Sequence, residues 1–135
     1  MSTALRKFEF AHIKEYTVAS GQTATAGRCA VFSGSDTEVD DAGADSDLVI
    51  GIFLTTAAAG ARTSLALFGP VVPVVVGTGG ATRGKKAVPV SDGVTDAATL
   101  ADGDTAKPTV GIFMQSGTAG QTVGMQLCRG IQESV

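Results

Sequence analysis

Short apolar runs separated by glycine-containing polar turns recur along the whole chain. The clearest example lies between Val49 and Val72, where the runs 49–54 and 65–68 flank a segment of small residues that contains Gly60. Each run is too short for a helix and is rich in β-branched or aromatic residues, which predicts two strands joined by a turn. Gly60 is the residue that adopts a positive φ without steric cost.

The same pattern returns near the C-terminus, between Val110 and Leu127. Three matches carry the repetition, and they are Gly51-Ile52-Phe53 with Gly111-Ile112-Phe113, Ala59-Gly60 with Ala119-Gly120, and Leu65-x-Leu67 with Met125-x-Leu127. Upstream of these, Ala24–Val31 matches Ala81–Val88 and aligns Gly27 with Gly84. The sequence therefore predicts two tandem β repeats, at about residues 16–72 and 73–132, that pack as one body in residues 16–135.

No segment longer than about eight residues has helical periodicity. With many short strands and 18 glycines, the predicted fold class is all-β, as a small barrel or a sandwich. Gly27, Gly60, Gly84 and Gly120 are the predicted structural turn glycines. Two polar, acidic segments, Ser33–Asp47 and Ser91–Lys107, are predicted to be loops. Pro70 and Pro73 lie at the join of the repeats and indicate a strand end or an edge there.

Residues 1–15 lie outside both repeats. Lys7 to Ile13 alternate between apolar and polar positions, which predicts a strand. This strand could complete the chain's own barrel, or it could be an arm that docks on a neighbouring molecule. Under the second alternative the candidate contacts with a partner or a second subunit are Arg6, Lys7, Phe8, Phe10 and Ile13.

Composition narrows the classes of function. Charged residues make up 17% of the chain, below the usual quarter, and low surface charge gives poor protection against association. A formal net charge of −3 supplies no overall attraction to nucleic acid or to an anionic membrane. No apolar run approaches the ~18 residues of a spanning helix, and no apolar export signal is evident at the N-terminus, so we expect synthesis in a cytoplasm.

Candidate chemistry is sparse, and we expect no catalytic site, cofactor or metal. Gly79–Lys85 has the spacing of a phosphate-binding loop but lacks the Ser or Thr and the helix that should follow. Acids of the segment 33–47 match a calcium loop only in part, since its glycine and final glutamate are missing. His12 is the single histidine, and Cys29 and Cys128 are the two cysteines, so a metal site or a Cys–His pair has no local signature.

The pattern of strands and turns resembles the capsid decoration (cement) proteins of tailed double-stranded DNA bacteriophages. Three segments carry the resemblance, and they are Val49–Val71, Thr25–Val31 and Ala81–Val88. The resemblance implies a non-enzymatic virion protein on the outer surface of the head, where it stabilises the shell by bridging neighbouring major capsid proteins. It also implies a homo-oligomer, with a trimer favoured and a dimer as the alternative. A non-viral β-rich binding or assembly module is the alternative function.

Overall fold

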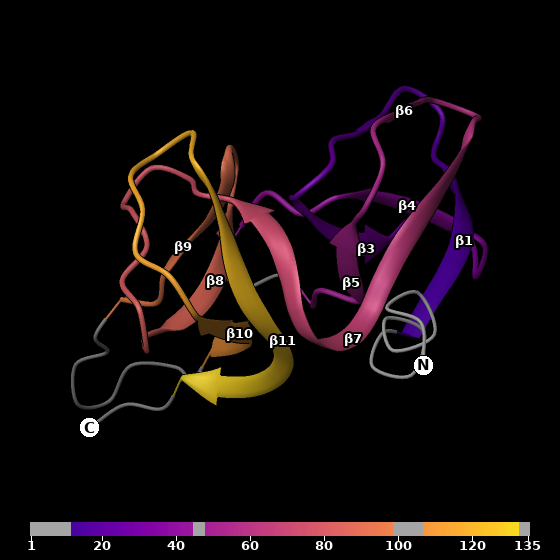
Figure 1. Cartoon of the computed structure of the whole chain (residues 1–135). Helices are drawn as coiled ribbons and strands as arrows, with labels where there is room; N and C mark the ends of the chain where they lie inside the picture. The colour runs from indigo at the N-terminus through magenta and orange to yellow at the C-terminus, as the bar shows by residue number, and fades with distance from the viewer. Residues whose placement is uncertain (1–11, 45–47, 99–106, 133–135) are drawn as a thin grey trace, which may run out of the picture.

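The computed structural model describes residues 12–44, 48–98 and 107–132, and within these ranges the chain contains strands and turns but no helix (Figure 1). The strands are β1 (His12–Val18), β2 (Thr23–Ala24), β3 (Cys29–Phe32), β4 (Glu38–Asp41), β5 (Gly51–Phe53), β6 (Ala57–Ala58), β7 (Arg62–Val75), β8 (Lys86–Val90), β9 (Gly93–Asp96), β10 (Lys107–Phe113) and β11 (Thr122–Gln132). The all-β prediction is confirmed.

The strands form two small barrels that share β7. Barrel one follows the order β1-β4-β3-β5-β7 and closes where β7 pairs with β1. Barrel two follows the order β7-β11-β10-β8-β9, and a parallel bridge between Val76 and Val94 brings β9 back to the end of β7. Residues 62–68 of β7 therefore belong to barrel one and residues 69–75 to barrel two. Figure 1 shows β7 bending between the two barrels.

Of the two alternatives expected at Pro70 and Pro73, a strand end or an edge, the strand end is wrong, because β7 runs through both residues. Its register with β11 passes directly from Val72 to Gly69, so Pro70 lies in a bulge where no ladder bond is needed. The amide of Val76 faces β11 and that of Val75 faces the opposite side. By alternation, the missing N–H of Pro73 also points away from β11, so the ladder to β11 loses no donor.

The predicted acidic loops also contain strands. Glu38–Asp41 forms β4 and Gly93–Asp96 forms β9. In β4 only Val39 points into barrel one and is buried, while its charged neighbours lie at partly exposed positions. One inward apolar residue is too short an alternating pattern to identify a strand from sequence, and pairing with β3 and β1 supplies the rest of the stabilisation.

Backbone hydrogen bonds demonstrate the internal repeat in three dimensions. The amides of the four turn glycines donate to matching carbonyls, from Gly27 to Phe53, Gly60 to Val18, Gly84 to Phe113 and Gly120 to Val76. All four glycines have a positive φ, between 79° and 89°. The strand β1 corresponds to the second half of β7. Lys14 pairs with Leu65 in repeat one, and the equivalent residues Val72 and Met125 pair in repeat two. The repeats therefore meet within β7, and the expected division at residue 15 falls inside β1.

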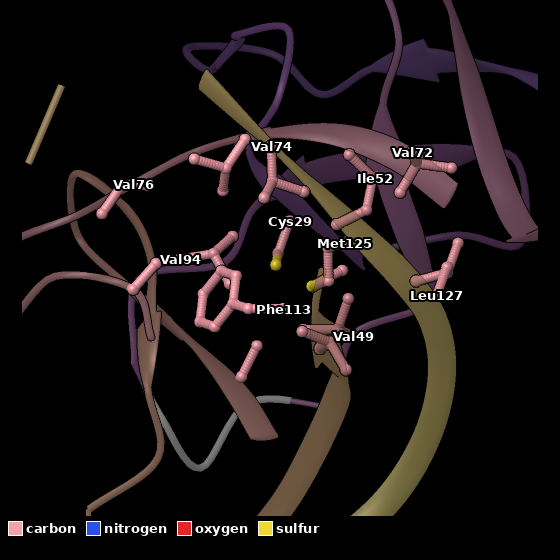
Figure 2. Packing of buried hydrophobic residues seen from close by; sticks show 14 of the residues in the cluster. Cys29, Val49, Ile52, Val72, Val74, Val76, Val94, Phe113, Met125 and Leu127 are labelled. Atoms are coloured by element: carbon pink, nitrogen blue, oxygen red, sulfur yellow. The ribbon is translucent and has the colours of Figure 1, made fainter. Parts of the chain in front are cut away.

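Seven buried side chains at matching positions fill each barrel. They are Tyr16, Val18, Ala24, Ala30, Val39, Phe53 and Leu65 in barrel one, and Val74, Val76, Ala81, Ala87, Val94, Phe113 and Met125 in barrel two. The cluster of barrel two also extends onto the outer face of repeat one, through Cys29, Ala42, Val49, Ile52 and Ala66 (Figure 2). The equivalent outer positions of repeat two include Lys86 and Gln126, which are exposed. The outer face of repeat one is therefore buried against repeat two, whereas the equivalent positions Lys86 and Gln126 of repeat two are exposed to solvent.

Gly27 and Gly84 provide a matched pair for testing this asymmetry. Both have nearly the same φ, 88° and 87°, so an alanine at either position incurs similar backbone strain of ~1–2 kcal/mol. A Cβ at Gly27 would lie 2.8 Å from Cγ2 and 2.9 Å from the amide nitrogen of Val75, whereas a Cβ at Gly84 meets nothing within 4 Å. We expect Gly27→Ala to lower the free energy of unfolding by about 1–3 kcal/mol more than Gly84→Ala. Urea denaturation of the two variants checks this, and equal losses would contradict the close approach of the repeats.

Candidate functional site

The end of barrel one nearest the start of β1 carries a cluster of apolar side chains that is only partly covered. We call it the mouth of barrel one, and it consists of Phe32, Ile50 and Leu67 around the buried Tyr16, with the side chain of Lys14 beside the Tyr16 ring. Ile50 and Leu67 are partly buried against the barrel interior. The rings of Tyr16 and Phe32 meet edge to face at 5.9 Å between centroids, and Nζ of Lys14 lies 5.4 Å from the centre of the Tyr16 ring. Phe32 remains 54% exposed.

The matching end of barrel two is covered. Its four equivalent positions are Val72, Pro89, Val110 and Leu127, and all of them are buried. Val72, Val110 and Leu127 belong to the same cluster as Val49, Ile52 and Ala66 from the outer face of repeat one. In Figure 2, Ile52 and Val72 lie together within this cluster. The two ends have equivalent positions, but the end of barrel one exposes the aromatic ring of Phe32 to solvent, whereas the equivalent Pro89 of barrel two is buried.

Further exposed apolar side chains lie on the outer surface near the start of β1. Ile13 is 46% exposed and pairs with Ala66 of β7, and Phe68, opposite His12, is 58% exposed. Ile13 is the one predicted contact residue within the described part of the chain. Arg6, Lys7, Phe8 and Phe10 lie outside the described residues, and their role as contacts stays a prediction.

The polar residues around Cys29 form a structural cluster. Nη1 of Arg28 donates to Oδ2 of Asp41 at 3.2 Å. Burial, and secondarily the charge of Asp41, raises the pKa of the Cys29 thiol. Burial likewise raises the pKa of Asp41, an effect that Arg28 opposes. A thiol that is enclosed and held protonated is a poor nucleophile and a poor metal ligand.

The other candidate motifs acquire no chemistry from the structure. Within residues 12–44, 48–98 and 107–132, no three His, Cys, Asp or Glu side chains come together as a group that could hold a metal ion. In the segment 79–85, Gly79, Gly80 and Gly84 have positive φ, and strand β8 follows at Lys86 where a phosphate-binding loop requires a helix. The described residues also contain no helix long and apolar enough to cross a membrane.

No family model matches the chain, and no curated protein matches its sequence. Among solved structures, the N base of the head fiber gp8.5 of bacteriophage phi29 is similar, with a TM-score of 0.66 and 16% sequence identity. The similarity covers 87% of this chain and 94% of that one. At this identity the likeness shows that the two chains share a fold over nearly their whole lengths.

The two cysteines should differ sharply in reactivity. Cys29 is buried with a raised pKa, whereas Cys128 is exposed, and both are free thiols. We expect one thiol per native chain to react rapidly with a chromogenic disulfide reagent, and the second to react only after unfolding. Cys128→Ser should abolish the fast reaction, whereas Cys29→Ser should preserve it. Rapid reaction of both thiols in the native wild-type protein would contradict the enclosure of Cys29.

Proposed function

We propose that this protein binds the outer surface of a bacteriophage head and stabilises the shell by bridging neighbouring major capsid proteins. The observation that carries the proposal is the similarity in fold, along 87% of the chain, to the base of a phage head fiber. The resemblance of Val49–Val71, Thr25–Val31 and Ala81–Val88 to the decoration proteins supports the same function from the sequence. On this proposal the protein is made in the host cytoplasm and is located on the outside of the virion.

We further propose that the protein acts without catalysis. Cys29, the buried thiol, is enclosed and protonated, and the described acidic side chains gather into no metal site. What the chain offers is a rigid β body with exposed apolar side chains such as Phe32 and Phe68. Residues of this kind suit an interface with another protein.

Bridging follows from multivalent binding to a repeating surface. A contact of modest area with one capsid protein is weak by itself, but simultaneous contacts with neighbours raise the overall affinity by orders of magnitude. A homo-oligomer at a symmetry axis of the shell provides such contacts, and we favour a trimer at local threefold positions, with a dimer at twofold positions as the alternative. The formal net charge of −3 suits an outward-facing protein that does not compete for DNA.

The direct test is co-sedimentation of the purified protein with undecorated, expanded phage heads, with the bound copies per head counted. We expect saturable binding at a copy number that matches the threefold positions. Saturation at the number of twofold positions would instead indicate a dimer. An absence of binding to heads would contradict the proposal and favour the non-viral binding or assembly module.

A second test concerns the predicted contacts at the N-terminus. Reversing two charges, in Arg6→Glu with Lys7→Glu, should weaken head binding about tenfold if both side chains pair with capsid carboxylates. The control is Arg83→Glu with Lys85→Glu, which makes the same change in net charge at exposed positions of repeat two. Equal effects in the two double variants would contradict a specific role for Arg6 and Lys7.

A further inference from the structure

The two barrels carry an exposed aliphatic side chain at one equivalent position. Lys14 of β1 corresponds to Val72 of β7, a step of 58 positions (72 − 14). The same step leads from Ile13 to Val71, and these side chains are 46% and 52% exposed. Because Lys14 and Val72 lie at the ends of the barrel interiors, strand alternation directs Ile13 and Val71 to the outer surfaces.

In barrel one, a second exposed apolar side chain lies beside this position. The pairing of β1 with β7 sets His12 opposite Phe68 and Ile13 opposite Ala66. Ile13 and Phe68 are therefore diagonal neighbours on adjacent strands. Phe68 is 58% exposed. We call Ile13 and Phe68 patch one.

In barrel two, the neighbour of Val71 is reached across a glycine. A Cβ at Gly124 would lie 2.9 Å from Cγ1 of Val71, and on the other side the amide of Met114 donates to the carbonyl of Gly124 at 2.9 Å. Met114 is 46% exposed. We call Val71 and Met114 patch two. Leu54, which is equivalent to Met114, is partly buried, so Phe68 is instead the second exposed residue of patch one.

The fold does not require an apolar residue at Ile13 or Val71, because both side chains are about half in solvent. At another outer position the two repeats differ according to burial, with the buried Ala66 in repeat one and the exposed Gln126 in repeat two. Ile13 and Val71 are alike although both are exposed. One rigid body therefore presents a similar apolar surface twice, which fits two copies of the same partner.

The size of the patches favours a repeating surface over a second copy of this chain as the partner. Two half-exposed side chains offer roughly 200 Å² of apolar area, against about 800 Å² on each partner in a stable complex of two proteins. One patch alone therefore gives a weak contact. Two patches on one chain reinforce each other when they bind adjacent units of the same surface.

We propose that patch one and patch two contact two neighbouring copies of the same capsid protein, so that a single chain bridges them. This inference rests on the proposed function and assigns the bridging contacts to named residues. The two barrels supply one contact each, and bridging is then a property of each chain, whether or not the chain forms an oligomer.

Matched serine variants test the contribution of each patch. Ile13→Ser and Val71→Ser should each weaken the binding of the protein to phage heads about tenfold, because either change weakens one of two linked contacts. The control is Leu48→Ser, which alters a side chain that is 77% exposed and lies in neither patch, and it should leave head binding unchanged. Wild-type affinity in either patch variant would overturn the proposal.

Thiol protection tests whether both patches are covered at once. In a Cys128→Ser background, which removes the exposed native thiol, Ile13→Cys and Val71→Cys should each react rapidly with a chromogenic disulfide reagent in the free protein. Both should react slowly on saturated heads, whereas Leu48→Cys should stay reactive. Protection of only one patch would overturn the proposal. Protection in the free protein that disappears on dilution would assign the patches to a second copy and would also overturn it.

The wild-type protein separates the two levels of the account. If it does not bind heads, the proposed function fails, and the assignment of the patches fails with it. If it binds heads while either patch remains reactive, only the assignment of the patches fails.

Discussion

The pairing of one strand, β7, with partners in both barrels is the interaction on which the rest of the structure depends. Its first half closes barrel one against β1 and its second half opens barrel two through β11. The bulge around Pro70 bends the strand between the two halves without interrupting it. The outer face of repeat one packs against repeat two, because buried residues of both repeats form one apolar cluster. The matching hydrogen bonds of the turn glycines complete each barrel around this strand.

The same arrangement makes the two repeats unequal in the surfaces that they expose. Cys29 and Ala66 lie on the outer face of repeat one where it is buried, and Lys86 and Gln126 occupy the equivalent, exposed positions of repeat two. A polar outer face disfavours the stacking of another repeat against it, as in other repeat proteins. Ile13, Phe32 and Phe68 of barrel one are among the large apolar side chains that remain exposed, together with Leu48, Val71 and Met114. Exposed apolar side chains of this kind suit the proposed contacts with a partner protein.

The sequence predicted what depends on local chemistry. Gly51-Ile52-Phe53 and its copy revealed the repeat because buried strands and tight turns tolerate few residue types. The sequence did not predict the features that depend on contacts with distant parts of the chain. The strand β4 carries a single inward residue, Val39, and exists because β1 and β3 pair with it. The strand β7 accommodates Pro70 because this residue lies in a bulge, and it accommodates Pro73 because the missing N–H points away from β11. The sequence does not reveal the mouth of barrel one, because this site is defined by its contrast with the buried equivalent positions in barrel two.

The central claim is that this two-barrel body belongs to the outside of a phage head. A cryo-electron microscopy reconstruction of virions produced with and without the protein tests it most directly. The account predicts difference density on the outer surface of the shell, at local symmetry axes, that fits the two barrels and touches more than one capsid protein. Difference density inside the shell, at the tail alone, or on a single capsid protein without a second contact would contradict the account.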